Sequence, residues 1–320
     1  MHTTDDFLFL PDNTLDYLGL STGDVADAIE VALIAKAEGR LHTSPKSAIL
    51  PGGGRYMMST LAVGDDGFVV VKQVSVCPEN PSRGLASING AIMVLDAETG
   101  LLRAVVGANW ITAIRTAALS AVAARRLADP ASETVAFVGT GVQARSHLDA
   151  YAAMYPLKRI RIVGRGQENI DRLARMAHEY GLEAEALDSA QDALDGADLI
   201  VTSITLNYEV EPFLDARWLK PTAFAAITDL CIPWAPKGMS AFGTVVVDDR
   251  VQEAESERPM LPYDQIAGDL TELVSGQVPE RIQGKPSAFA FRGIALGDYA
   301  AAVLAVQTAE RTGAGQRISS

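Results

Sequence analysis

The segment after residue 138 has the composition and spacing of a phosphate-binding loop. It reads GTGVQA (139–144), directly after the apolar run TVAFV and directly before a helical pattern over Ala144 to Tyr155. In the G-x-G-x-x-G/A pattern, Gly139 permits a tight turn, Gly141 lets the backbone approach a pyrophosphate, and Ala144 is small enough for helix and strand to pack. The helix N-terminus then favours the negative charge. A bare glycine turn would not require this strand-turn-helix setting, so the sequence predicts a dinucleotide site.

The residue after the next predicted strand bears on the choice between NAD and NADP. An acid that binds the adenine ribose is expected about 20 residues beyond the glycines, but this chain has Gly164 and Arg165 there. Arg165 can accept the 2′-phosphate of NADP or stack on the adenine of NAD. This feature leaves both cofactors open.

Three charged residues stand in apolar surroundings. Arg115 offers a planar fork suited to binding a carboxylate through two hydrogen bonds, although a helix-surface arginine is the simpler alternative. Lys72 ends an apolar strand that is predicted to be buried, where a lysine without a partner or function is costly. Asp229 follows the apolar run 223–227, at the carboxyl end of a strand where open α/β sheets bind ligands, although it could simply form a turn.

Composition narrows the class of protein. The chain has 320 residues, a formal net charge of -13 and two cysteines, Cys77 and Cys231. This length favours two domains, and the negative charge disfavours nucleic acid and anionic membrane surfaces as partners. Neither a disulfide framework nor a zinc cluster can be built from two distant cysteines. A polar start over Met1 to Asp6, without a long apolar run, predicts a cytoplasmic protein that does not insert into membranes.

The pattern of elements changes near residue 112. Before it, a helix (Val25 to Gly39) and strands (Gly67 to Val76, Gly90 to Asp96) indicate an α+β domain. A helix over Thr112 to Ala128 then precedes regular β/α alternation, which predicts a parallel, Rossmann-like sheet. Its strands are expected at Thr134 to Val138, Arg159 to Val163, Asp198 to Ile204, Ala223 to Ile227 and Thr244 to Val247.

The C-terminal part is predicted to return to the first domain. The apolar segment Ser287 to Ile294 fits poorly as another crossover and precedes a last helix over Leu296 to Glu310. The tail from Thr312 to Ser320 has the composition of a flexible segment.

Five segments occur here in the order found in one enzyme family. They are VVVKQVSVCPENP around Lys72, ANWITAIRTAALSA around Arg115, the GTGVQA loop, AAITDLCIP around Asp229, and FAFRGIALGDYAAA near the C-terminus. Over nearly its whole length the chain resembles the ornithine cyclodeaminase/mu-crystallin family. The resemblance implies an α/β fold in which a Rossmann domain (119–287) is inserted into an α+β substrate-binding and dimerisation domain (1–118 with 288–320). It also implies a homodimer with an active site between the two domains.

The resemblance also implies roles for particular residues. Lys72 and Arg115 match the family's substrate-carboxylate ligands, and Asp229 matches its catalytic acid. The positions that match cofactor contacts are Ser87, Arg115, Thr116, Val142, Gln143, Thr205 and Asp229, beside Gly139, Gly141 and Arg165. In the implied reaction the nicotinamide delivers hydride to an iminium carbon, and Lys72 or Asp229 handles the proton on nitrogen.

The chain departs from the family where members usually carry an arginine near 46, a Met-Pro pair near 58 and a serine in the C-terminal F-x-x-S-x-G. It has Lys46, Met58-Ser59 and Arg292 at these places, and Arg55 nearby. The added positive charge and hydroxyl disfavour the second ammonium of ornithine and favour a second carboxylate. The chain also looks like the family's iminosuccinate reductases, so the favoured reaction is reduction of iminosuccinate to L-aspartate with NAD as cofactor. Lys46 and Arg55 could instead be solvated surface charges.

Three other functions stay open. They are an ornithine cyclodeaminase-type lyase that uses NAD catalytically, an alanine dehydrogenase, and a non-catalytic crystallin-like binding protein. His147, inside the helix after the glycine loop, is expected to be structural, and His42 is at best a rim residue.

Overall fold

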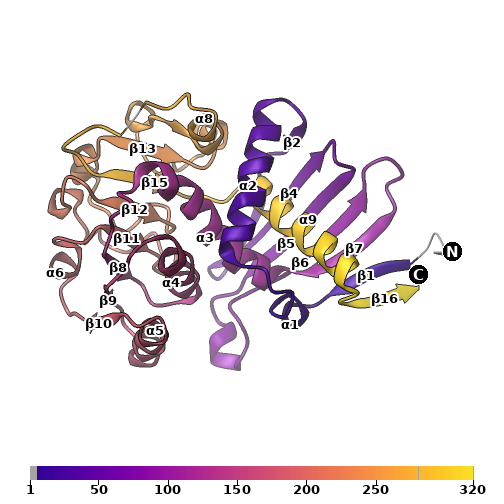
Figure 1. Cartoon of the computed structure of the whole chain (residues 1–320), viewed down its shortest axis with the longest axis horizontal. Coiled ribbons are helices and arrows are strands. Elements are labelled where there is room, and N and C mark those ends of the chain that lie inside the picture. Colours follow the sequence, from indigo (N-terminus) through magenta and orange to yellow (C-terminus); the bar gives the residue numbers. More distant parts are fainter. Residues whose placement is uncertain (1–5, 280, 320) are drawn as a thin grey trace. The chain divides into compact units, whose positions relative to one another are not determined.

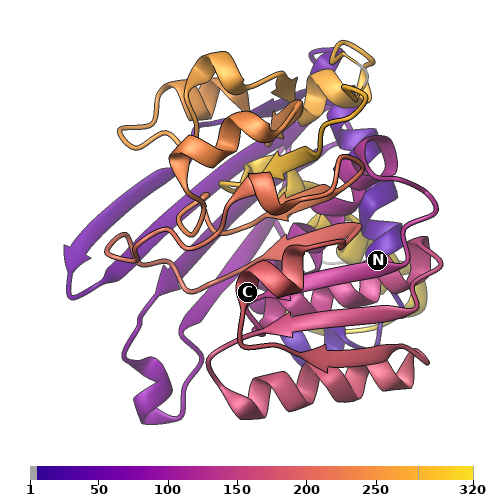
Figure 2. The same cartoon turned by 90° about the vertical axis from the view of Figure 1, so that its left-hand side faces the viewer.

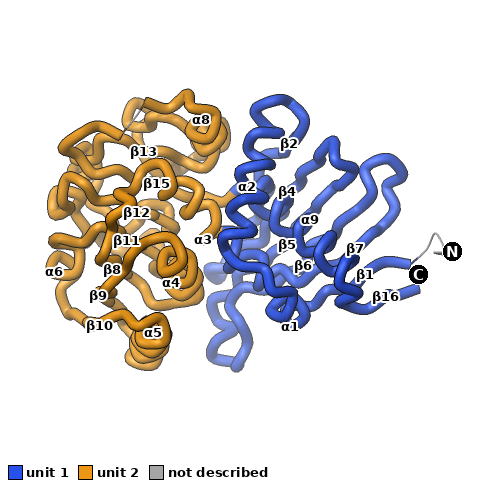
Figure 3. Tube along the Cα trace, in the orientation of Figure 1, with its two compact units in different colours: residues 1–115, 294–320 blue, residues 116–293 orange. Residues whose placement is uncertain are grey.

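The computed structural model describes residues 6–279 and 281–319. The chain divides into two compact units (Figure 3): unit 1 runs up to Arg115 and resumes at Ile294, and unit 2 comprises Thr116–Gly293. Helix α3 (Ala108–Leu127) therefore contributes residues to both units. In the described part of the chain, no helix combines the length and the apolar character that crossing a membrane requires.

Unit 1 is built on a mixed eight-stranded sheet. Its strands, in spatial order, are β16 (Gln316–Ser319), β1 (Asp6–Leu10), β7 (Leu102–Gly107), β6 (Ile88–Asp96), β5 (Phe68–Val76), β4 (Arg55–Gly64) and β2 (Leu41–Thr43), with β3 (Ser47–Gly52) also paired to β4. The pair β1 and β7 is parallel and the other pairs are antiparallel. This arrangement confirms the predicted α+β character of the first domain.

Two long helices, α2 (Thr22–Ala37) and α9 (Ala295–Thr312), lie together across one face of this sheet (Figure 1). Ser21 begins α2 with a capping box in which its hydroxyl accepts from the Asp24 N–H and the Asp24 carboxylate accepts from the Ser21 N–H. Helix α9 is alanine-rich and mostly buried, so it packs closely between α2 and the sheet. A single-turn helix, α1 (Asp12–Leu15), follows β1.

The C-terminal segment is ordered as a strand, contrary to the prediction of a flexible tail. Gly313 ends α9 in the left-handed conformation, and Gly315 also has a positive φ of 87°. These two glycines turn the chain back, so that β16 pairs antiparallel with β1 at the edge of the sheet. Ser320 lies outside the described residues, as do Met1 to Asp5 of the polar start.

Unit 2 has a parallel sheet with helices on both faces (Figures 1 and 2). The strand order is β10 (Glu183–Ala186), β9 (Arg159–Val163), β8 (Thr134–Val138), β11 (Leu199–Thr202), β12 (Phe224–Ile227), β15 (Ser287–Ala290), β13 (Thr244–Val247) and β14 (Gly268–Asp269). The helices are α4 (Val142–Met154), α5 (Gln167–Glu179), α6 (Ala190–Leu194), α7 (Arg250–Ala254) and α8 (Leu270–Val274). Short 3-10 turns lie at Asn80–Arg83 in unit 1 and at Ala216–Trp218, Pro236–Ala241 and Tyr263–Gln265 in unit 2. The central strands are buried on both faces, which explains their continuous apolar runs.

The segment Ser287 to Ile294 does not return to the first domain as predicted. Strand β15 lies between β12 and β13 and runs parallel to both, and the Ser287 hydroxyl donates to the Leu127 carbonyl at 2.9 Å. The boundary between the units therefore falls at Gly293 and Ile294 instead of 287 and 288, and Thr116 to Ala118 belong to unit 2. The described residues between α8 and β15 form no further helix, so the approach to β15 lacks the pattern of a helical crossover.

Candidate active site

The glycine loop joins β8 to α4 in unit 2, at the point where the strand order reverses from β8-β9 to β8-β11. Gly139 has a φ of 100°, and a Cβ there would lie 2.5 Å from the carbonyl oxygen of Ser203. At Gly141, the N-cap of α4, an added Cβ would meet nothing within 4 Å, and no side chain caps the helix. Gly139 is thus required by the protein itself, whereas Gly141 leaves space for a ligand against the backbone.

The next strand ends close to this loop. A Cβ on Gly164 would lie 2.8 Å from Cγ2 of Thr140, so Gly164 lets the end of β9 pack against the glycine loop. Arg165 follows and is exposed, as are Val142 and Thr205, while Gln143, behind them on α4, is partly buried. These four predicted cofactor residues lie at the carboxyl ends of β8, β9 and β11, which is where a parallel sheet binds dinucleotides.

Asp229 is completely buried at the carboxyl end of β12. Its carboxyl group accepts a hydrogen bond from the Thr202 hydroxyl at 3.0 Å and one from the Ile204 N–H at 3.2 Å. The Trp234 indole donates to the same Thr202 oxygen at 3.3 Å. Burial raises the pKa of Asp229 to about 7, although these hydrogen bonds favour the charged form. A substantial fraction of Asp229 is therefore a neutral acid at physiological pH.

The backbone immediately after Asp229 is strained. Leu230 and Cys231 both have a φ of 58°, and they are the described non-glycine residues with positive φ. The turn is held by two backbone hydrogen bonds, from the Ile232 N–H to the Asp229 carbonyl and from the Trp234 N–H to the Cys231 carbonyl, each at 3.1 Å. Consecutive left-handed residues with side chains are costly and concentrate at functional sites. The turn that contains Asp229 is thus kept in a conformation that local preferences disfavour.

A buried cluster of opposite charges forms in unit 1. The ammonium of Lys72 donates to Oδ1 of Asp298 at 2.8 Å, and Nε of Arg115 lies 3.0 Å from the same oxygen. The Thr60 hydroxyl lies 3.2 Å from Oδ2. All four residues are at most 4% exposed. Lys72 and Arg115, which the sequence predicts to bind a carboxylate, are therefore placed together, on a carboxylate that the protein itself supplies.

Burial and electrostatics act in opposite directions on this cluster. Burial is the main cause that lowers the pKa of Lys72 to about 8; Asp298 opposes it, while the positive charges of Arg115 and Lys46 lower it further. Burial on its own would raise the pKa of Asp298, but Lys72 and Arg115 outweigh it, so that pKa is lowered. Asp298 is therefore ionised and forms a true counter-ion.

The sequence-based reasoning missed Asp298. Its segment was recognised only as a family motif, and no role was predicted for the acid. A signal was present, because Asp298 is the single acidic residue between Ser287 and Thr308, in a run that packs on the sheet. A lone acid in an apolar helix face requires a buried partner.

Lys46, a predicted substrate-binding residue, lies beside the buried cluster. Ser47 pairs with Ser59 across β3 and β4, so Lys46, one residue earlier, continues this register opposite Thr60. Thr60 in turn pairs with Lys72 on β5, and the positive charge of Lys46 is one of the causes that lower the pKa of Lys72. Lys46 is partly buried.

Ser59 and Arg55 are placed differently from the prediction. Neighbouring side chains on a strand point to opposite faces, and Thr60 reaches Asp298 on the helix-covered face, so Ser59 faces the other side. Arg55 is exposed, donates to the carbonyls of Gly52 and Pro51 at 3.1 and 3.3 Å, and lies five residues before Thr60 on β4, or about 17 Å. Both side chains therefore lie away from the buried cluster of Lys72, Arg115 and Asp298.

Arg292 is held inside unit 2. Its Nε donates to Oε2 of the buried Glu253 at 2.8 Å, and its Nη2 donates to the Arg258 carbonyl at 2.8 Å. Glu253 neutralises the charge that the substrate prediction required. The sequence did not reveal this pairing, because the acidic run 253–257 has the composition of a solvated face.

His147 has the structural role that the sequence suggests. It is fully buried, with Nδ1 at 2.7 Å from the Gln143 carbonyl and Nε2 at 2.9 Å from the Ser120 hydroxyl. Because a carbonyl only accepts, Nδ1 carries the hydrogen and Ser120 donates to Nε2. Burial lowers the pKa of His147 to about 4. The neutral ring thus ties α4 to the part of α3 that follows Thr116.

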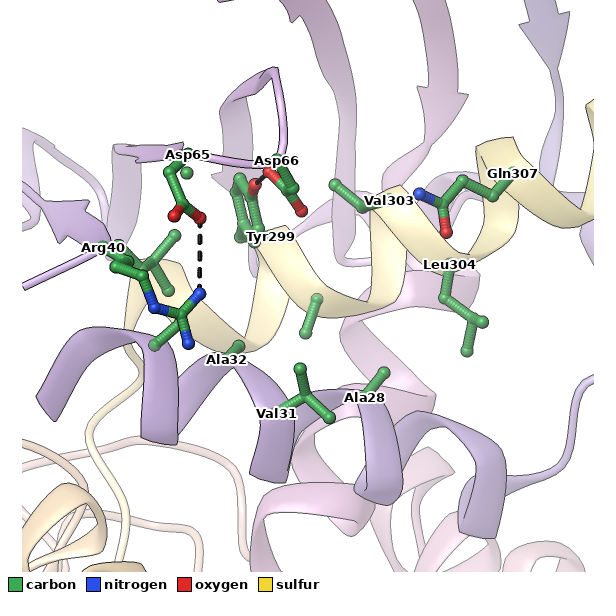
Figure 4. Close-up of a pocket in the computed structure, with 14 residues that line it drawn as sticks. Ala28, Val31, Ala32, Arg40, Asp65, Asp66, Tyr299, Val303, Leu304 and Gln307 are labelled. Atoms are coloured by element: carbon green, nitrogen blue, oxygen red, sulfur yellow. Dashed lines mark hydrogen bonds and ion pairs between the residues drawn. The ribbon is translucent and has the colours of Figure 1, made fainter. Parts of the chain in front are cut away.

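Two predicted cofactor residues remain. Thr116 is buried on α3. Ser87 lies in the connection before β6 in unit 1 and is partly exposed; its carbonyl accepts from the Cys77 N–H at 2.7 Å. A separate hollow of about 240 Å³ lies between α2 and α9 (Figure 4). Arg40 and Asp65 pair at 3.4 Å at one end of it, and Tyr299 donates to Asp66. None of the predicted site residues lines this hollow.

Over residues 6–279 and 281–319, the structure groups no His, Cys, Asp and Glu side chains as a metal site.

The chain is similar to known proteins over most of its length. The sequence profile of the ornithine cyclodeaminase/mu-crystallin family matches residues 15–313. Ketimine reductase mu-crystallin of Mus musculus is 30% identical over 240 residues, which is 74% of each chain. Iminosuccinate reductase of Paracoccus denitrificans is 27% identical over 325 residues, covering 94% of this chain and 96% of that protein.

The fold also matches solved structures. That of Thermococcus litoralis Delta(1)-pyrroline-2-carboxylate reductase, in complex with NADH and L-proline, superposes with a TM-score of 0.88 at 24% identity. The match covers 98% of this chain and the whole of that one. It confirms the α/β fold with its Rossmann unit.

Proposed function

The chain belongs to the ornithine cyclodeaminase/mu-crystallin family, and we propose that it uses NADH to reduce the C=N bond of a small 2-imino acid. The observation that carries this proposal is the buried pair Lys72 and Arg115, two cations gathered at one point of an otherwise acidic protein. The open space at Gly141 fits a dinucleotide pyrophosphate. The three relatives named above are reductases of imines, which supports the reaction type.

The substrate carboxylate would bind to Lys72 and Arg115. Both cations are fixed by Asp298, so little side-chain entropy is lost when an anion binds. Unit 1 would thus hold the substrate, as the predicted substrate-binding domain. Bound NADH supplies the hydride that converts the imine carbon to an amine carbon.

Asp229 is the proposed proton donor to the imine nitrogen. Its pKa of about 7 leaves a fraction protonated at neutral pH, and an iminium accepts hydride more readily than a neutral imine. Lys72, the alternative donor, is committed to Asp298 by a 2.8 Å hydrogen bond. We therefore assign proton donation to Asp229 and carboxylate binding to Lys72.

The favoured substrate is iminosuccinate, with L-aspartate as product. Of the four residues predicted to bind its second carboxylate, Lys46 lies beside Thr60, in the same row of the sheet as Lys72. Ser59 faces the other side of the sheet, Arg55 donates to the Gly52 and Pro51 carbonyls, and Arg292 is paired with Glu253. Because three of these four residues are not placed for a second carboxylate, the second candidate is a monocarboxylic imine, such as that of pyruvate. A variant of Lys46 therefore distinguishes iminosuccinate from a monocarboxylic imine.

The test is oxidation of NADH and NADPH with oxaloacetate or pyruvate in the presence of ammonia, for the wild-type chain and Lys46→Gln. Iminosuccinate reduction predicts preference for oxaloacetate, lost in Lys46→Gln with pyruvate activity retained. If the wild type and Lys46→Gln reduced each substrate at the same rate, the monocarboxylic candidate would be supported. Release of ammonia from ornithine at catalytic NAD, without net NADH oxidation, would overturn the reductase in favour of the lyase.

NAD is the proposed cofactor, although the exposed Arg165 fits either phosphate state. The same assay decides this point, because an NADP enzyme would oxidise NADPH faster. A binding protein without activity would oxidise neither cofactor with any imine.

The proposed homodimer would use the sheet face of unit 1 opposite α2 and α9. Strand register places Leu61, Val71, Met93 and Val105 in one apolar row across β4, β5, β6 and β7. Leu61 is 40% exposed and Met93 44% exposed, and an apolar row of this kind is typical of an interface. Light scattering should show a dimer for the wild type and for the control Val251→Glu, and a monomer for Met93→Glu.

A further inference from the structure

We infer that Asp298 is a positioning residue of the carboxylate site, which fixes Lys72 and Arg115 and cancels one of their two positive charges. The pair then presents one net positive charge, matched to a single carboxylate. This inference rests on the proposed function, because it assigns a carboxylate to these two cations.

The geometry supports a shared counter-ion. One oxygen of Asp298 serves both Lys72 and Arg115, at 2.8 and 3.0 Å, and the other oxygen is oriented by Thr60 at 3.2 Å. The four residues come from β4, β5, α3 and the first turn of α9. A carboxylate in the first turn of a helix is also stabilised by the helix dipole. Asp298 is thereby held in a single orientation, and it transmits that orientation to both cations.

Folding alone does not account for the cluster. Buried charges lose hydration, and replacing a buried ion cluster by apolar side chains is often neutral or stabilising. Apart from Tyr299, the neighbours of Asp298 on α9 are alanine, leucine and glycine, and the sheet face that α9 covers is largely apolar. Within the cluster two cations, Lys72 and Arg115, share one anion. A bound carboxylate would add a second anion.

Asp298 also determines the pH range in which Lys72 carries its charge. The groups that face Lys72 are Asp298 on α9, Arg115 on α3 and Lys46 before β3. Asp298 is the only one of these three that favours the ammonium form. Without it, burial and two neighbouring cations would drive the proton from Lys72 at a lower pH. Carboxylate binding should then weaken at neutral pH.

The experiment measures pyruvate binding to the NAD⁺-saturated protein by calorimetry from pH 6 to 9.5, so no turnover is needed. Wild-type affinity should fall as the pH rises through about 8. In Asp298→Asn this fall should begin about one pH unit lower, which makes binding about threefold weaker at pH 7.5, about tenfold weaker at pH 9 and nearly normal at pH 6. NAD⁺ affinity should not change.

The matched control is Asp66→Asn, which alters the acid that binds Tyr299, the neighbour of Asp298 on α9. It should reproduce the wild-type profile. An unchanged profile in Asp298→Asn, or a loss that is the same at every pH, would overturn the inference. Should Asp298→Asn not fold, Asp298→Glu keeps the charge but displaces its oxygens, and about threefold weaker binding or more is expected at unchanged pH dependence. Wild-type affinity in Asp298→Glu would also overturn the inference.

The outcome also separates this inference from the proposed function. Loss of pH-dependent pyruvate binding in Asp298→Asn, with no imine reduced by the wild type, would retain the carboxylate site and reject the reductase. If the wild type reduces an imine but Asp298→Asn binds pyruvate with the wild-type pH dependence, the reductase would be retained and the role of Asp298 rejected.

Discussion

The proposed site residues of the two units are buried in opposite ways. In unit 1, Lys72 and Arg115 share the counter-ion Asp298, so all three stay ionised inside the protein. In unit 2, Asp229 is buried with a hydroxyl and a backbone N–H as its hydrogen-bond donors, and its pKa rises to about 7. A counter-ion stabilises a fixed charge, which suits binding, whereas dipoles leave the charge free to change, which suits proton transfer. The difference predicts that mutations in the two units affect different kinetic constants.

The largest effect is expected from Asp229→Asn. It removes the proton donor while keeping the shape of the side chain, so kcat should fall by about 10²–10⁴-fold. In the wild type, kcat should decline as the pH rises through about 7, because the acid is the protonated form. Steady-state kinetics across pH would test both points. A variant with normal kcat, or a wild-type profile without this limb, would assign the proton to another group.

Arg115→Lys should act on binding instead. Lysine keeps the charge but loses the planar fork, so KM for the imino acid should rise by about 10–100-fold with a smaller change in kcat. Initial rates at varied substrate and saturating NADH give both constants. If kcat fell as far as in Asp229→Asn, the proposed division between binding and proton transfer would be wrong.

The glycine loop offers a stability test of unit 2. A Cβ on Gly139 would meet the Ser203 carbonyl in a left-handed backbone, so Gly139→Ala should destabilise folding by about 1–3 kcal/mol. Gly141→Ala meets nothing within 4 Å and should fold normally, but bind NADH more weakly. Thermal unfolding and NADH fluorescence titration distinguish the two. Equal NADH affinity for Gly141→Ala and the wild type would show that the pyrophosphate does not bind against Gly141.

The smallest effect concerns His147, a second group that unit 2 buries without a counter-ion. Its pKa is about 4 in the folded chain and about 6.5 when unfolded, so the unfolded state binds the proton first as the pH falls. Its contribution to stability is complete above about pH 6.5 and is lost towards pH 4. Between pH 7.5 and 5.5 the wild type should lose about 1 kcal/mol that His147→Gln does not lose. Urea unfolding at both pH values measures this difference, and parallel losses would contradict it.

The local pattern of the chain predicted much of the fold. The strands of unit 2 from Thr134 to Val247 and the helices α2, α3, α4 and α9 lie close to the expected residues, because apolar periodicity reports burial directly. The errors arose where long-range pairing decides. Strand β15 is inserted between two earlier strands, and β16 depends on its pairing with β1.

The site residues divide in the same way. The sequence predicts roles for Gly139, Gly141, Lys72, Arg115 and Asp229, since unusual residue types in apolar or turn contexts are visible locally. It could not show that Arg292 is neutralised by Glu253, which lies 39 residues away in the chain. It also could not show that Ser59 faces away from Thr60's partner, because face assignment depends on strand register.

The sequence by itself determined the Rossmann unit, its glycine loop and the family, since these depend on spacing within short segments. The tertiary structure decided which charges are paired. Asp298 lies 226 residues from Lys72 in the chain, and packing of α9 on the sheet brings the two within 2.8 Å. Charge pairing inside a protein depends on distance and burial, and neither quantity is encoded in neighbouring residues.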